Sequence, residues 1–213
     1  MSHLLTSSGK GAPLTPTEAD ANLSLLETRT GDGWFDNVSQ LYLRDTADSA
    51  DPSPFVGGIS LRRFVPNEMR EAFAEFHIPH TWRPGTMMYP HVHFTILSAG
   101  AGTVRWGFEY IFARTQRSDA FTQYPATSTT LYLEQVIPAN SERTHFVVEA
   151  AQGQGIPGTD LEVDGMILAR VFRDGAHAND TFESDVFGIT VDLHTEIDRY
   201  STPFRFPPFY TEP

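Results

Sequence analysis

The 213-residue chain contains no cysteine. Disulfide bonds, thiolate metal sites and a cysteine nucleophile are therefore excluded. Basic residues are also few: 15 arginines and lysines stand against 27 acidic residues, which gives a formal net charge of −12. Without a cluster of positive charge, no direct binding of nucleic acid is expected. Lys10 is the single lysine, and a positive charge carried by arginine favours fixed, bidentate ion pairs with carboxylates.

Long apolar runs are missing as well. No stretch approaches the roughly 20 consecutive apolar residues that span a bilayer, and residues 1–20 lack the apolar centre of a signal peptide. We therefore expect no membrane contact and synthesis in a cytoplasm. The sequence also lacks a Gly-x-Ser-x-Gly elbow, a phosphate-binding glycine loop and a dinucleotide fingerprint, so no cofactor is predicted.

The two ends of the chain differ in composition from its middle. Residues 1–33 are rich in serine, threonine, glycine and proline, which predicts an extended arm that needs a partner to become rigid. Residues 201–213 carry several aromatic side chains among prolines, a composition that excludes a regular helix and predicts a docking tail. Residues 34–200 are left as one β-domain.

The middle of the chain alternates between apolar and polar residues, as β-strands with one buried face do. One clear example is Val104, Trp106, Phe108, Tyr110 and Phe112 at every second position. Residues 66–73 predict one or two helical turns, but no segment keeps a helical apolar period. The pattern predicts an all-β, antiparallel sandwich of jelly-roll topology. The expected strands are 41–45, 74–82, 91–98, 103–113, 129–138, 144–150, 165–173 and 185–198.

The last expected strand shows the cleanest alternation. It predicts one buried face and one solvated face. The buried face would hold Phe187, Ile189, Val191, Leu193 and Ile197. The solvated face would hold Thr190, Asp192, His194 and Glu196.

Histidines suggest a metal site. His91 and His93 stand two apart on an expected strand, so both imidazoles project from one face, and His145 lies on a later strand. These three imitate a cupin site, in which a jelly-roll barrel holds iron, manganese or zinc. One hypothesis is therefore a cupin-like metal-dependent enzyme, or a sugar-binding module, that uses His91, His93 and His145.

The residues around these histidines argue the other way. Val92, Phe94 and Ile96 occupy the opposite face of the same expected strand, and these are the side chains that belong inside. Residues 94–98 also contain no carboxylate to complete a cupin site. We therefore predict that the histidines face outward or toward a neighbouring subunit, and that no metal is held.

Other ionisable side chains have simpler interpretations. His77 and His80 are predicted to be structural, and Glu109, Asp192 and Glu196 to lie on a solvated sheet face. Arg170 and Arg173 are predicted to form ion pairs and turn contacts at a strand end, together with Asp174, Asp180 and Asp185. No catalytic, metal-binding or cofactor-binding residue is predicted, which indicates a protein that is not an enzyme.

Several short motifs follow one another in residues 34–198. They are Trp34-Phe35-Asp36-Asn37, Pro79-His80-Thr81-Trp82, Gly85-Thr86 with Tyr89-Pro90-His91-Val92-His93, Val104-Arg105-Trp106-Gly107-Phe108-Glu109-Tyr110, and Arg170-Val171-Phe172-Arg173-Asp174 with the segment from Phe187 to His194. In order and spacing this stretch resembles a group of tailed-bacteriophage structural proteins with a jelly-roll-like β-domain.

The resemblance implies a non-enzymatic, homo-oligomeric virion component made in the bacterial host cytoplasm. Such a component would dock on or bridge neighbouring capsid, neck or tail subunits, as a head decoration or cement protein or as a tail-associated protein. Its partners would be other virion proteins.

Overall fold

The structure, a computed structural model, describes residues 11–30, 33–115 and 123–197. Strands dominate this part of the chain, as the alternating sequence predicts. They are β1 (Gly33–Gln40), β2 (Pro52–Val56), β3 (Ile59–Phe64), β4 (Met69–His77), β5 (Met88–Ile96), β6 (Gly102–Ala113), β7 (Thr129–Ile137), β8 (Phe146–Glu149), β9 (Met166–Asp174) and β10 (Val186–Ile197). A helix, α2 (Pro16–Thr30), precedes them, and a 3-10 turn, η1 (Gly158–Asp160), lies between β8 and β9.

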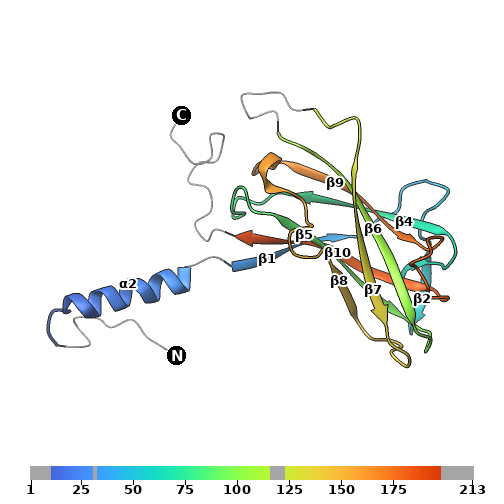
Figure 1. The fold of residues 1–213 in the computed structure, drawn as a ribbon, viewed down its shortest axis with the longest axis horizontal. Helices are drawn as coiled ribbons and strands as arrows, with labels where there is room; N and C mark the ends of the chain where they lie inside the picture. Colours follow the sequence, from blue (N-terminus) through green and yellow to red (C-terminus); the bar gives the residue numbers. More distant parts are fainter. Residues whose placement is uncertain (1–10, 31–32, 116–122, 198–213) are drawn as a thin grey trace.

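The strands form two antiparallel sheets that pack face to face (Figure 1). Sheet A has the order β2-β3-β10-β5-β8, with β1 also paired to β10, and sheet B has the order β4-β9-β6-β7. When β3 is counted as the first strand and β10 as the eighth, the orders become 1-8-3-6 and 2-7-4-5. Each sheet therefore interleaves early and late strands, as a jelly roll does. The predicted antiparallel sandwich is confirmed.

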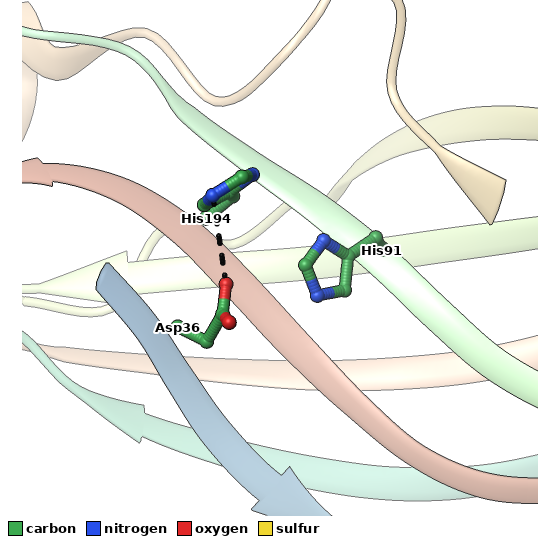
Figure 2. A group of neighbouring side chains, drawn as sticks. All are labelled: Asp36, His91 and His194. Carbon is green, nitrogen blue, oxygen red and sulfur yellow. Dashed lines mark ion pairs between the residues drawn. The ribbon is translucent and has the colours of Figure 1, made fainter. Parts of the chain in front are cut away.

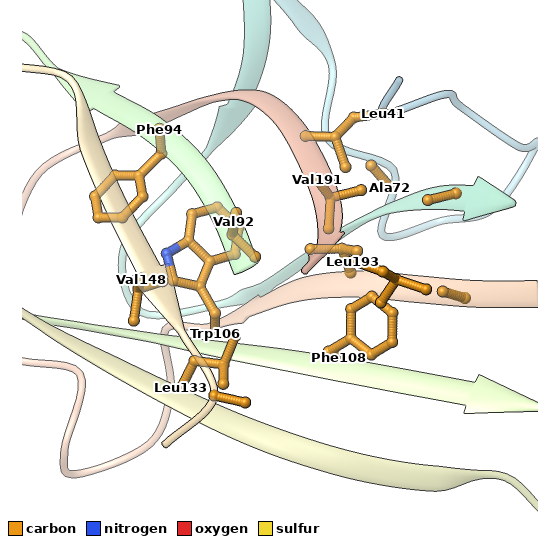
Figure 3. Close-up of a cluster of buried hydrophobic side chains, with 14 of the residues drawn as sticks. Leu41, Ala72, Val92, Phe94, Trp106, Phe108, Leu133, Val148, Val191 and Leu193 are labelled. Carbon is orange, nitrogen blue, oxygen red and sulfur yellow. The ribbon is translucent and has the colours of Figure 1, made fainter. Parts of the chain in front are cut away.

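Aromatic and branched side chains from both sheets fill the space between them (Figure 3). Trp106 lies at the centre, with its ring 4.8 Å from that of Phe64 and 5.5 Å from that of Phe94. Val104 and Phe108, its neighbours on the inner face of β6, are also fully buried. Each buried side chain of this size stabilises the fold by about 1.5–3 kcal/mol, so β6 anchors the core as its alternation predicts.

Strand β10 lies in the middle of sheet A and contacts three strands. Along one edge it pairs with β5, and along the other it pairs first with β3 and then with β1. The register shifts between Gly188 and Thr190, which indicates a β-bulge. Because of the bulge, the predicted buried face is wrong in part. Val191 and Leu193 are fully buried, but Ile189 is 40% exposed.

The segment before β5 also differs from the predicted secondary structure. Residues 41–45 do not form a strand, and only Tyr42 bridges to Phe73. The helical turns predicted for 66–73 are wrong because β4 begins at Met69. Strands β1, β2 and β3 were not predicted. Pro52 and Pro54 explain part of this failure, because proline is tolerated only on an edge strand such as β2.

The N-terminal arm is not wholly extended, since residues 16–30 form the helix α2. Its start is a capping box: the Thr15 hydroxyl accepts a hydrogen bond from the Glu18 amide, and Glu18 Oε2 accepts one from the Thr15 amide at 2.8 Å. Pro16 occupies the first helical position, where its missing N–H costs nothing. Within the described ranges, no helix is long and apolar enough to cross a membrane. The predicted tail, 201–213, lies outside the described residues.

Candidate functional site

Polar side chains gather on the outer face of sheet A, where β5 and β10 run side by side. The register pairs Asp192 with His91 and Thr190 with His93, and both histidines point away from the core. Val92, Phe94 and Ile96, which alternate with them, are fully buried. The predicted orientation of this strand is therefore confirmed, and the interior arrangement of a cupin site is not formed by His91 and His93.

The centre of this surface is a contact between two imidazoles and one carboxylate. His91 Nε2 and His93 Nε2 each lie 3.0 Å from Asp192 Oδ2. His91 is only 6% exposed and Asp192 only 4%. The prediction that Asp192 lies on a solvated face is wrong, because the surrounding side chains shield its carboxylate. We call His91, His93 and Asp192 the central trio.

Further polar groups surround the central trio. His93 Nδ1 lies 2.8 Å from His145 Nε2, and His194 Nδ1 lies 2.8 Å from Glu149 Oε1. His194 Nε2 also faces Asp36 Oδ1 at 3.6 Å, with His91 beside them (Figure 2). The structure thus brings together all three histidines of the cupin hypothesis, but outside the sandwich.

The electrostatic environment shifts the pKa values of His91 and His93 in opposite directions. Burial alone would lower the pKa of His91, but its hydrogen bond to Asp192 and the negative charges around it outweigh burial and raise the pKa above the usual 6.5. For His93, burial lowers the pKa, and the neighbouring His91 and His145 lower it further against the attraction of Asp192. The pKa of His91 is therefore raised and that of His93 lowered, although both rings contact the same carboxylate oxygen.

A small pocket of about 220 Å³ lies beside His194 and Glu149, two of the groups that surround the central trio. Its aromatic walls are Trp34 and Tyr89, whose rings meet edge to face at 5.9 Å. Its polar walls include His194, Glu149 and Gln152. Because Trp34 is 55% exposed, the pocket offers an accessible aromatic surface next to hydrogen-bonding groups.

Arg170 and Arg173 form ion pairs with carboxylates, as predicted. Arg170 donates to Glu109 Oε2 at 2.6 Å and to Glu71 Oε2 at 2.7 Å on the outer face of sheet B. Arg173 forms a buried pair with Asp180 at 2.7 Å. Their predicted acidic neighbours are also paired, Asp174 with Arg105 and Asp185 with Arg63.

The remaining histidines that the sequence singled out lie elsewhere. His77 is at the end of β4 and contacts Asp164 Oδ1 at 2.8 Å. His80 lies in the connection between β4 and β5. Neither belongs to the central trio or its surroundings, and the structural roles predicted for them stay predictions.

Comparison with protein families and curated proteins does not place the chain in a family. No protein-family model matches the chain, and no curated protein matches it either.

Proposed function

We propose that this protein is a non-enzymatic structural subunit of a bacteriophage virion, which docks on or bridges neighbouring capsid, neck or tail subunits. The resemblance of residues 34–198 to tailed-phage structural proteins supports the proposal. The jelly roll is compatible with it, because this fold is common in viral capsid proteins. Fold alone does not define function, so the physical support comes from the surface of the molecule.

The helix α2 offers a surface for a partner. It has no extensive contact with any strand of the described sandwich and extends away from it in Figure 1. A 15-residue helix is marginal on its own in water, and Leu23 on it is 58% exposed. A helix of this kind gains stability when a partner buries its surface. We therefore assign α2 to contact with a neighbouring virion subunit.

The sandwich surface offers further contact area. Large apolar side chains remain exposed on the outer faces of both sheets, namely Trp34, Val38, Tyr132, Val136 and Val147. Strand β7 ends sheet B and strand β8 ends sheet A, and such edges can accept an added strand from a partner. Apolar patches and open edges favour a protein that is built into an assembly.

Purified particles of the phage that encodes this chain test the proposal. We expect the chain to remain with the particles through a density gradient, at a fixed copy number set by their symmetry. A version without residues 1–30 should keep its thermal midpoint but fail to load onto particles. Recovery of the full chain only in the soluble fraction would overturn the virion assignment, and full loading of the truncated chain would overturn the role of α2.

The pocket beside the central trio favours a second candidate function, a sugar-binding module. Aromatic rings next to a carboxylate and an amide suit the apolar face and hydroxyl groups of a sugar ring. Among the three tryptophans, Trp82 and Trp106 are fully buried. A sugar that binds here should therefore change the emission of Trp34, and the change should disappear in Trp34→Ala. Unchanged emission across a panel of sugars would remove this candidate.

A further inference from the structure

We propose that His91, His93 and Asp192 form a binding site for one divalent first-row transition-metal ion on the outer face of sheet A. The proposal is independent of the virion role. It also differs from a cupin site in position, because the ligands lie outside the sandwich. It differs in composition too, because the carboxylate comes from a strand far along the chain.

The spacing of the donor atoms suits a metal. Each Nε2 atom lies 3.0 Å from Asp192 Oδ2, and one donor atom from each residue falls within 4.8 Å of the others. An ion about 2.0–2.2 Å from each ligand holds neighbouring donors about 3.0–3.5 Å apart. Two imidazoles and a carboxylate form a donor set typical of zinc, iron and similar ions, with positions left open for water or another ligand.

One atom of the central trio lacks the partner that its burial requires. His93 Nε2 is shielded from solvent and has no hydrogen-bond partner of suitable geometry, although it lies 3.0 Å from Asp192 Oδ2. A buried polar atom without a hydrogen bond destabilises the folded protein. A metal ion that accepts the lone pair of this nitrogen would satisfy it and would use the same carboxylate.

The groups around the central trio are placed as supporting groups usually are. Metal-bound histidines commonly engage their second nitrogen with another polar group, which fixes the orientation of the ring. His93 Nδ1 contacts His145 Nε2 at 2.8 Å, and His91 Nδ1 faces Glu149 Oε1 at 3.8 Å. We therefore assign His145 and Glu149 as positioning residues, which act through the two ligand histidines.

The scaffold fixes the site before an ion arrives. His91 and His93 are two residues apart on β5, and Asp192 is directly opposite His91 on β10, in the middle of sheet A. Sites on paired strands are held more tightly than sites on loops. The His93 side chain is 18% exposed, against 8% for His91 and 6% for Asp192, so His93 is the most exposed member of the central trio.

A second group of possible ligands, Asp36, His91 and His194, shares His91 with the central trio. It is the weaker candidate because the Asp36 side chain is 54% exposed and lies 3.6 Å from His194 Nε2. The central trio is more buried and contains the unsatisfied nitrogen, so we place the ion there.

Zinc titration of the full-length chain tests the proposal. The protein is purified without a histidine tag, stripped with chelator, and titrated with zinc chloride in a calorimeter. We expect about one zinc per chain and a higher thermal midpoint on binding. In nitrogen-15 spectra of the histidine rings, the signals of His91 and His93 should shift. A chain that takes up no zinc, or one in which these two rings do not shift, overturns the proposal.

Three variants locate the ion. Asp192→Asn keeps the shape of a ligand but removes its charge, and should weaken zinc binding by about 100-fold or more; His145→Ala should weaken it by roughly 10–100-fold. His77→Ala is the matched control, because it removes a histidine at the end of β4 in sheet B that contacts the carboxylate of Asp164, and should leave zinc affinity unchanged. Equal losses in His77→Ala and Asp192→Asn would contradict the site. If Asp192→Asn does not fold, the ring signals of the unchanged protein decide alone.

Discussion

Arg173 and Asp180 form a two-pronged ion pair that is shut off from solvent. Arg173 Nε lies 2.9 Å from Asp180 Oδ2 and Nη2 lies 2.7 Å from Oδ1, with both side chains at most 1% exposed. The same guanidinium donates to the carbonyls of Phe64, Phe182 and Ser184. This pair therefore ties the loop between β9 and β10 to the end of β3, beside the core.

Breaking this pair should be strongly destabilising. Arg173→Met leaves the Asp180 carboxylate buried without its counter-charge, and we expect a loss of about 3–5 kcal/mol in the free energy of unfolding. Urea denaturation measures it. Arg63→Gln is the matched control, because the Arg63–Asp185 pair is exposed at 3.6 Å and should contribute only about 0–1 kcal/mol. Similar losses in both variants would contradict the role of burial.

Gly107 is required by the packing on the outer face of sheet B. A Cβ at this position would overlap the Phe172 ring, which also packs under the Arg170 guanidinium at 4.6 Å. Gly107→Ala should therefore destabilise the protein by about 1–3 kcal/mol, as measured by thermal or urea unfolding. Gly58→Ala, where an added Cβ meets nothing within 4 Å, is the control and should change stability little. An unaffected Gly107→Ala protein would show that the Phe172 ring moves aside freely.

Acid should weaken sheet B through Glu109. Burial alone would raise the pKa of Glu109, but hydrogen bonds from Ser128 and Arg170, together with the charge of Arg170, lower it below the usual 4.5. A lowered folded pKa means that the contribution of this carboxylate is complete above pH 4.5, and is lost as the pH falls through the lower folded value. Glu109→Gln should therefore flatten the pH dependence of stability below this pH.

The same pH series with the exposed Glu142→Gln serves as the control for Glu109. That variant should follow the unchanged protein through the acid range. If the stability of Glu109→Gln still falls steeply in acid, other carboxylates are responsible for the loss.

The helix α2 should matter for docking and not for the sandwich. Ala21→Pro places a proline inside α2, where it costs about 3 kcal/mol of helix stability. Because α2 lacks extensive contact with the described strands, the thermal midpoint should stay the same while loading onto particles falls. Ala21→Ser, which keeps the helix, is the control. Normal loading of Ala21→Pro would show that the helical form of this segment is not needed.

Local sequence patterns predicted the strands whose own residues alternate clearly between apolar and polar side chains. The alternation in β6 and the burial of Val92, Phe94 and Ile96 on β5 follow from each residue's immediate neighbours. The bulge in β10 at Gly188 broke the predicted face, because an inserted residue reverses the alternation beyond it. The capping box Thr15-Pro16-Thr17-Glu18 was a local signal for α2 that the low apolar content of the arm concealed.

The centre of the candidate site depended on information that no local pattern contains. His91 and His93 could be found from their spacing, but Asp192 is 101 residues from His91 in the sequence. Its position opposite His91 is set by the pairing of β5 with β10, which follows from the whole topology. Its carboxylate contacts His93 on β5 and Thr190 on β10, and the contact with His93 likewise depends on the pairing of these two strands.

Cryo-electron microscopy of particles from a phage that carries this gene tests the proposed virion role most directly. We predict density for the two-sheet sandwich at symmetry-related positions on the head, neck or tail, with α2 lying against a neighbouring subunit. Particles that lack such density, from cells in which the folded chain accumulates as free protein, would contradict the assignment.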